Sequence, residues 1–279
     1  MHPLVDAITL AAHLDDPRWI VFDCRHDLMA PAAGEALYRE GHIAGARFAH
    51  LDRDLSGAKD GLHGRHPLPT RDAFAAFLAE SGVDRDSVVV AYDASNGLYA
   101  ARLWWMTRWI GHADVVVLDG GLGAWTRAGL PTTATIPEAK HADIAVGTAL
   151  VTLVDTGDVE ANLASGARLV LDARAPERYR GEVEPLDPVA GHIPGAANHP
   201  MALSLEADGR FKDAASLRAA FASTLGDRPV ATVIQSCGSG VTACHGLLAM
   251  EVAGLPGAAL YAGSWSAWCA DPLRPVARG

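Results

Sequence analysis

The sequence predicts an α/β protein of two tandem domains, each with a mainly parallel sheet flanked by helices. The first reason is repetition: an Asp-x-Arg motif at residues 23–25 returns at 172–174, and a Gly-His-Ile-x-Gly-Ala motif at 41–46 returns at 191–196. Both motifs return in the same order after about half of the chain, which is typical of two homologous halves. The second reason is that short apolar runs alternate with helical patterns, as in parallel α/β sheets.

Each predicted element has a local reason. Thr70 can cap a helix that ends before Gly82, and Asp213 can cap its counterpart, which ends before Gly226. The apolar runs lack the alternation of half-exposed strands, so we expect strands that are buried on both faces of a sheet. These runs are residues 19–22, 88–92 and 115–118 in the first half and residues 168–171, 230–234 and 258–261 in the second.

The expected organisation is a first domain at residues 1–138, a linker at 139–150 and a second domain at 151–279. The linker lies in the most polar and least periodic stretch between the halves, where Pro131 and Pro137 interrupt regular structure. A chain of 279 residues also suits two domains of ordinary size.

Composition narrows the possible function classes. The formal net charge of -10 disfavours nucleic acid or an anionic membrane surface as a partner. We expect no transmembrane helix, because no apolar run reaches about twenty residues, and no secretory signal. The four cysteines form no Cys-x-x-Cys pair, so we expect no metal site. We also expect no cofactor, and four cysteines in a chain of this length suit a reducing, cytoplasmic location.

The stretch around Cys237 carries the strongest chemical signal. It follows the apolar run at 230–234 and precedes a helical pattern at 243–251, so the cysteine is expected where a buried strand turns into a helix. Gly238 and Gly240 allow a tight turn there. A loop at a helix start directs several backbone N–H groups and the positive helix end toward one point. Both effects favour the thiolate, which is the nucleophilic form of cysteine.

The corresponding loop of the first half has Asp93 at the position of Cys237. A carboxylate cannot carry sulfur, so the first half is interpreted as a catalytically silent copy. Cysteine phosphatases also place a cysteine at such a turn, but they need an arginine six residues later to bind phosphate. Here that position is Ala243, which disfavours phosphoryl transfer.

With these motifs in view, the chain resembles the two-domain rhodanese-family sulfurtransferases over nearly its whole length. The Cys-Gly-Ser-Gly-Val-Thr run at 237–242 resembles the active loop of 3-mercaptopyruvate sulfurtransferases. Members that use thiosulfate typically carry basic residues in this loop, and here there are none. The resemblance implies that Cys237 takes a sulfane sulfur from a small donor as a persulfide and passes it to cyanide or to a thiol such as thioredoxin.

The resemblance also implies a Ser–His–Asp relay formed by Ser239, His66 and Asp52. A hydroxyl two residues after the nucleophile can be polarised by a neutral imidazole that a carboxylate orients. Two of the three residues lie in the first half of the sequence, so the silent half would contribute to the catalytic site. The alternative is that His66 and Asp52 are ordinary loop residues.

Donor binding is assigned by the same resemblance to Arg178 and to the loop residues Gly238, Gly240, Val241 and Thr242. A planar guanidinium suits a bidentate grip on a carboxylate such as that of 3-mercaptopyruvate.

The chain departs from the family beside that arginine. A second arginine is usual in the following Glu-Pro-rich segment, where this sequence has Leu186 and Asp187. Arg180 is a candidate substitute, and a solvated surface arginine is the plainer interpretation of it. Thiosulfate therefore stays open as the donor, and a non-enzymatic sulfur carrier or sensor is the alternative outside catalysis.

Overall fold

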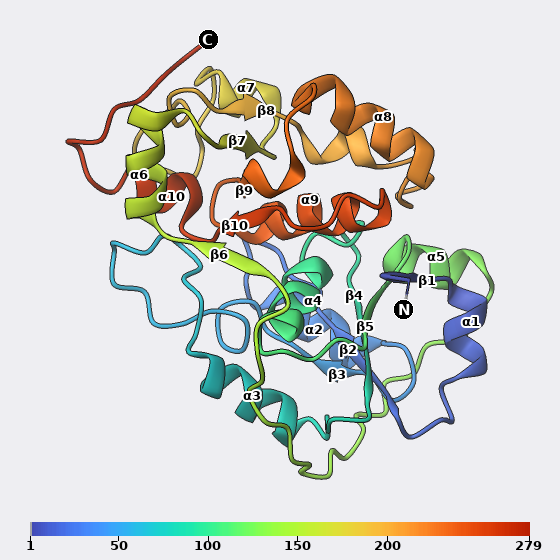
Figure 1. Ribbon diagram of the computed structural model, residues 1–279. Coiled ribbons are helices and arrows are strands. Elements are labelled where there is room, and N and C mark those ends of the chain that lie inside the picture. The colour runs from blue at the N-terminus through green and yellow to red at the C-terminus, as the bar shows by residue number, and fades with distance from the viewer. Residues whose placement is uncertain (1) are drawn as a thin grey trace. The chain divides into compact units, whose positions relative to one another are not determined.

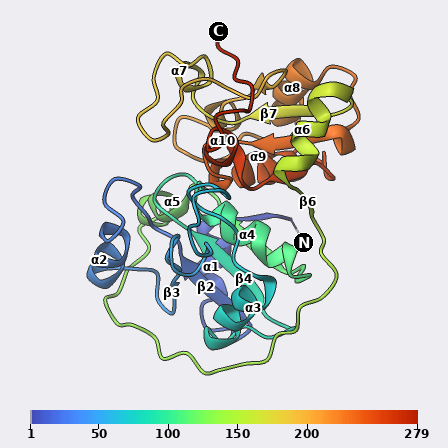
Figure 2. The same ribbon diagram turned by 90° about the vertical axis from the view of Figure 1, so that its left-hand side faces the viewer.

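The computed structural model describes residues 2–279, which form two compact α/β units. The first unit extends to Gly57 and includes Pro69–Leu150 and Glu206–Phe211. The second unit consists of Ala58–Leu68, Val151–Leu205 and Lys212–Gly279. Figures 1 and 2 show the sheet and the helices of each unit.

The first unit has a five-stranded sheet in the order β1-β5-β4-β2-β3, and every neighbouring pair of strands is parallel. Its strands are β1 (Leu4–Val5), β2 (Trp19–Asp23), β3 (Arg47–Phe48), β4 (Val88–Tyr92) and β5 (Val115–Leu118). Its helices are α1 (Ala7–Ala12), α2 (Ala33–Glu40), α3 (Arg71–Glu80), α4 (Ala100–Trp109) and α5 (Gly121–Arg127).

The second unit repeats this topology, with the order β6-β10-β9-β7-β8 and parallel pairing throughout. Its strands are β6 (Thr152–Val154), β7 (Leu169–Asp172), β8 (Ala197–Asn198), β9 (Val233–Ser236) and β10 (Ala259–Tyr261). Its helices are α6 (Thr156–Ser165), α7 (Pro176–Tyr179), α8 (Ala214–Leu225), α9 (Val241–Val252) and α10 (Ser264–Trp268), with 3-10 turns η1 (Met201–Ser204) and η2 (Val230–Thr232). The matching strand orders confirm the predicted pair of similar α/β domains.

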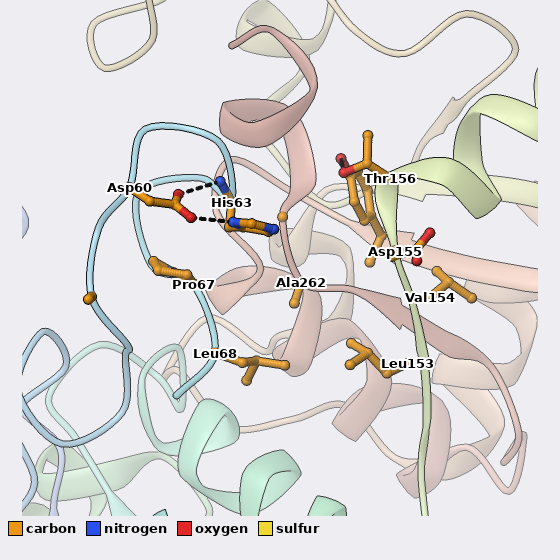
Figure 3. A pocket seen from close by; sticks show the side chains of 12 residues that line it. Asp60, His63, Pro67, Leu68, Leu153, Val154, Asp155, Thr156 and Ala262 are labelled. Carbon is orange, nitrogen blue, oxygen red and sulfur yellow. Dashed lines mark hydrogen bonds and ion pairs between the residues drawn. The ribbon is translucent and has the colours of Figure 1, made fainter. Parts of the chain in front are cut away.

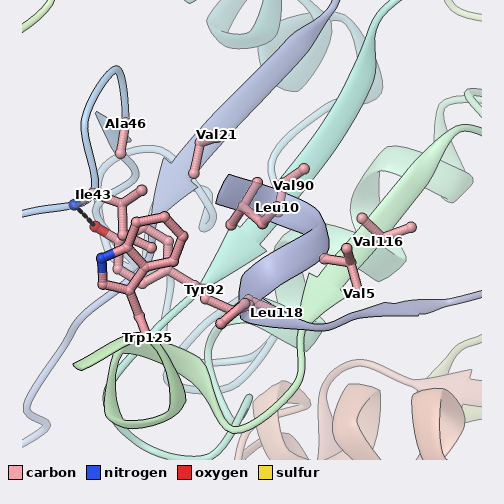
Figure 4. Packing of buried hydrophobic residues seen from close by; sticks show 11 residues of the cluster. Val5, Leu10, Val21, Ile43, Ala46, Val90, Tyr92, Val116, Leu118 and Trp125 are labelled. Atoms are coloured by element: carbon pink, nitrogen blue, oxygen red, sulfur yellow. Dashed lines mark hydrogen bonds between the residues drawn. The ribbon is translucent and has the colours of Figure 1, made fainter. Parts of the chain in front are cut away.

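The cores form where the apolar strands meet their helices. In the first unit, side chains from β2, β4 and β5 pack with Leu10 and with Trp125, as Figure 4 shows. The indole of Trp125 is buried and donates to the carbonyl of Pro131 at 2.9 Å. In the second unit, Trp268 donates in the same way to Pro275 at 2.9 Å. Each tryptophan therefore fills its core without leaving a buried N–H unpaired.

The two recurring motifs bind to each other. Arg25 pairs with the carboxylate of Asp23 at 2.7 Å and donates to the carbonyl of Gly41 at 2.6 Å. In the second unit, Arg174 makes the equivalent two contacts at 2.6 and 2.7 Å. A buried charge needs such a partner. The Asp-x-Arg motif thus anchors the start of the Gly-His-Ile-x-Gly-Ala motif to the end of a strand in both units.

Two local predictions can be compared directly with the structure. Thr70 and Asp213 cap α3 and α8, with side-chain oxygens that accept from the first-turn N–H groups, as expected. The run at 230–234 was expected to be a strand throughout, and this is wrong for its first half. Pro229 precedes a 3-10 turn over Val230–Thr232, and the Thr232 hydroxyl donates back to the Pro229 carbonyl at 2.7 Å, so β9 begins only at residue 233.

The compact units differ from the two consecutive halves of the chain by two exchanged segments. Ala58–Leu68 packs with the second unit, and Glu206–Phe211 packs with the first, where the Phe211 N–H donates to the Asp119 carboxylate at 2.8 Å. The polar stretch at 139–150 is an extended segment of the first unit. Backbone hydrogen bonds join it to α3 and to the end of α4.

No helix within residues 2–279 combines the length and the apolar character that crossing a membrane would need.

The burial of His199 predicts that the stability of the fold depends on pH. His199 stacks on Phe221, with ring centroids 4.3 Å apart, and burial lowers its pKa to about 4. The unfolded chain takes up the proton nearer the ordinary value of 6.5. The neutral His199 side chain therefore contributes its full share to the stability of the fold above pH 6.5, and this contribution is lost progressively as the pH falls toward 4.

We expect urea unfolding at pH 7 and pH 4.5 to reveal this loss, and His199→Gln to reduce it by about 2 kcal/mol. The exposed His141 provides the matched control, His141→Gln, which should keep the wild-type pH dependence. Equal pH dependence in the wild type and in His199→Gln would contradict the prediction.

Candidate active site

Cys237 occupies the turn between β9 and α9, as its sequence context predicted. Gly240 closes the turn with a φ of 76°, and a β-carbon there would lie 2.3 Å from the carbonyl oxygen of Ala262. Only glycine fits that position. The cysteine is buried, with 1% of its surface exposed.

The start of α10 fixes the backbone of this loop. The Cys237 N–H donates to the Ser264 hydroxyl at 3.0 Å, and the Trp265 N–H donates to the Cys237 carbonyl at 3.0 Å. The Ser266 N–H donates to the Gly238 carbonyl at 2.9 Å. Ser264 has a φ of 51°, a left-handed conformation that costs a non-glycine residue energy. Its two hydroxyl contacts, with Cys237 and with the Tyr261 carbonyl, hold it there.

The equivalent loop of the first unit is closed around a carboxylate. The Asp93 side chain is fully buried and accepts four backbone N–H groups at 2.7 to 2.9 Å. Burial raises the pKa of Asp93, and these donors oppose that rise. The Asp93 carbonyl accepts from Leu122 at 2.8 Å, as Cys237 does from Trp265. A turn of this kind therefore gathers backbone donors around an anion, although the first-unit loop at 93–99 is three residues longer than the loop at 237–240.

Two members of the predicted relay lie together. The Nδ1 atom of His66 is 2.8 Å from the hydroxyl oxygen of Ser239, and both side chains are buried. The loop that carries His66 belongs to the second unit, although it comes from the first half of the sequence. An imidazole can thus polarise a hydroxyl two residues from Cys237 within one compact unit.

Asp52 belongs to the first unit. Its backbone N–H donates to Nδ1 of His50 at 3.1 Å. Its carboxylate lies near the imidazoles of His26 and His50, so that one polar atom from each of the three side chains is within 4.8 Å of the other two. The role of Asp52 in the relay stays a prediction.

Arg178 lies beside the cysteine loop and is held by carboxylates. Its guanidinium pairs with Glu184 at 2.6 Å and with Asp187 at 3.6 Å. A β-carbon at Gly238 would lie 3.6 Å from both terminal nitrogens of Arg178. The segment that lacks the second family arginine therefore supplies acids that orient the first one.

A second arginine, Arg65, also lies next to Gly238, and the sequence does not indicate it. Arg65 pairs with Asp187, and its Nη2 atom would lie 2.9 Å from a β-carbon at Gly238. Arg180, the candidate substitute, instead pairs with Glu182 at 2.7 Å and is 42% exposed, as expected for a surface arginine. The available signal for Arg65 was its position next to His66.

The two acids between these arginines differ in their protonation behaviour. Burial opposes ionisation of Glu184, but the charge and hydrogen bond of Arg178, together with the N–H groups of Leu186 and Asp187, outweigh it and lower the pKa of this carboxyl group. Burial raises the pKa of Asp187 despite the hydrogen bond from Arg65. Both effects follow from carboxylates held in a poorly solvated position next to guanidinium groups.

A pocket of about 370 Å³ lies on another side of the Arg65 loop, between that loop and the ends of β6 and β10 (Figure 3). Asp60 and His63 line it, and His63 donates its N–H to Asp60 at 2.9 Å. The lining does not include Cys237, Ser239 or Arg178. This pocket is therefore distinct from the cysteine loop.

Comparisons with known proteins agree on one family. The rhodanese-like domain model matches the chain twice, at residues 6–128 and 155–271. A probable 3-mercaptopyruvate sulfurtransferase of Pseudomonas aeruginosa is 47% identical over 278 residues, which cover 99% of this chain and 98% of that protein. A putative thiosulfate sulfurtransferase of Mycobacterium tuberculosis is 40% identical over 285 residues, covering 99% of this chain and 97% of that protein.

A solved structure from the same family is also similar to this chain. The 3-mercaptopyruvate sulfurtransferase from Leishmania major matches with a TM-score of 0.81 and 29% identity, over 94% of this chain and 73% of that one. The fold is a pair of rhodanese-like domains, and only the second carries a cysteine in the loop after the central strand. The chain belongs to the rhodanese family.

Proposed function

We propose that this protein is a sulfurtransferase that moves a sulfur atom from 3-mercaptopyruvate to a thiol or cyanide acceptor through a persulfide on Cys237. The observation that carries the proposal is the pairing of a loop cysteine with the His66–Ser239 hydrogen bond. The names of the similar proteins support the same reaction class. A mere sulfur carrier would need the cysteine but not the paired serine and histidine.

The first step transfers sulfur to the enzyme. The Cys237 thiolate attacks the sulfur of 3-mercaptopyruvate, and the new S–S bond forms as the donor's C–S bond breaks. The electron pair of the broken bond moves into the adjacent carbonyl and gives an enolate. Uptake of a proton turns the enolate into pyruvate. Ser239, polarised by His66, is suited to donate a hydrogen bond to that developing oxyanion.

The second step regenerates the enzyme. An acceptor thiolate or cyanide attacks the outer sulfur of the Cys237 persulfide, and the S–S bond breaks with its electron pair returning to Cys237 as thiolate. The acceptor leaves as a persulfide or as thiocyanate. No cofactor is needed for either step. The four cysteines, all within the described residues, form no disulfide, which suits a reducing compartment such as the cytoplasm, and thioredoxin is a fitting acceptor class there.

Donor choice is tested by steady-state sulfur transfer from 3-mercaptopyruvate and from thiosulfate, measured side by side. We expect the first donor to be preferred, because loop residues 238–243 carry no basic side chain. A preference for thiosulfate would replace the proposed donor while keeping the persulfide mechanism. Absence of transfer from either donor would favour a sulfur carrier or sensor.

Replacing Arg178 with alanine is expected to raise KM for 3-mercaptopyruvate about 10- to 100-fold, the effect of losing a charged hydrogen bond. The matched control is Arg180→Ala, because Arg180 is an exposed arginine two residues away. An unchanged KM in Arg178→Ala would mean that the donor carboxylate is bound elsewhere.

A further inference from the structure

We propose that Arg65 is a second arginine that grips the carboxylate of the sulfur donor, beside Arg178, and that Asp187 holds the two guanidinium groups in position. The inference rests on the proposed function, because it concerns the donor of that reaction. Related proteins usually have a second arginine in the segment where this chain has Leu186 and Asp187. Here Arg65, which precedes His66, would contact the donor carboxylate instead.

The first support is the position of the two guanidinium groups. Both lie at Gly238, the residue directly after the nucleophile, with Nη2 of Arg65 at 2.9 Å and the terminal nitrogens of Arg178 at 3.6 Å from the position of a β-carbon. Any side chain at Gly238 would displace Arg65. The missing side chain thus leaves space beside Cys237 for two planar cations.

The second support is how the structure fixes Arg65 to the cysteine loop. The Arg65 N–H donates to the Ser266 hydroxyl at 3.1 Å, while the Ser266 N–H donates to the Gly238 carbonyl at 2.9 Å. Gly64 packs against the same residue, since its β-carbon would lie 2.7 Å from the Ser266 hydroxyl. One residue of α10 therefore sets the distance between the Arg65 backbone and the loop.

The third support is the arrangement of charge. The side chains of Arg65 and Arg178 are 25% and 19% exposed, whereas those of Asp187 and Glu184 are each 3% exposed. The acids therefore hold the guanidinium groups from the buried side. Each guanidinium has five N–H donors, so several stay available to a ligand.

This charge balance also bears on the class of donor. Two carboxylates neutralise most of the field of the two arginines, which weakens attraction for a dianion such as thiosulfate. A planar monoanionic carboxylate still gains two parallel hydrogen bonds from a guanidinium. The arrangement thus suits a 2-oxo carboxylic acid that carries its sulfur on the next carbon.

The test compares 3-mercaptopyruvate with its neutral carboxamide as donors. Arg65→Met is expected to raise KM for the acid about 10- to 100-fold and to leave kcat/KM for the amide unchanged. Arg65→Lys, which keeps the charge but not the planar fork, should recover part of the loss. Arg180→Met is the matched control and should behave as the wild type with both donors.

A second variant serves as the control for an effect on folding, because Arg65→Met removes one partner of the buried Asp187 carboxylate. Arg65→Met combined with Asp187→Asn removes that charge and should show the same reduced preference for the acid as Arg65→Met alone. A wild-type KM for the acid in Arg65→Met, or equal losses with acid and amide, would overturn the assignment while the proposed function stands. A wild-type protein inactive with both donors would refute both.

Discussion

Replacing Cys237 with serine is expected to lower sulfur transfer by about 10^4-fold or more, because the reaction passes through a covalent bond to this sulfur. A serine hydroxyl is not ionised near neutral pH and cannot form a persulfide. The exchange is almost isosteric, and the Cys237 backbone keeps its contacts with Ser264 and Trp265. The fold, followed by circular dichroism and the melting temperature, should be unchanged.

The matched control for this prediction is Cys244→Ser. Cys244 is also buried, and it lies in α9 with its thiol 3.2 Å from the Gly240 carbonyl. It sits about two helical turns beyond the nucleophile. We expect this variant to retain most of the activity. Substantial turnover by Cys237→Ser would contradict the assignment of the nucleophile.

The second large effect concerns the hydrogen bond between His66 and Ser239. We expect His66→Ala and Ser239→Ala each to lower kcat about 10^2- to 10^3-fold, the usual contribution of one proton-transfer group. Because the two side chains act as a pair at 2.8 Å, the double variant should be little worse than either single variant.

His63→Ala provides the control for the relay. His63 lies on the same loop, is exposed and pairs with Asp60. It should keep the wild-type kcat. Multiplicative losses in the double variant would mean that His66 and Ser239 act independently, and single variants with wild-type kcat would remove the relay from the mechanism.

Much of the fold could be predicted because its causes are local. Apolar runs at 88–92 and 115–118 form strands, and Thr70 and Asp213 cap helices through contacts within three residues. The motif repeat likewise predicted the two similar sheets. The run at 230–234 shows the limit, because the proline before it favours a 3-10 turn over the first residues.

The rest of the site depends on contacts between distant residues. Arg65 and Ser266 are hydrogen-bonded although 201 positions separate them, so no local sequence pattern indicates the contact. In the sequence, Asp187 stands out only as a departure from the family pattern. Its meaning emerges when Arg65 and Arg178 are seen on either side of it.

The central claim is that sulfur resides covalently on Cys237 during the reaction. The most direct measurement is the mass of the intact protein after reaction with 3-mercaptopyruvate in the absence of an acceptor, followed by peptide mapping. We predict a gain of one sulfur atom on the peptide that contains Cys237, its loss on addition of a thiol, and no gain in Cys237→Ser. Sulfur retained on a different cysteine, or pyruvate release without any sulfur on the protein, would contradict the account.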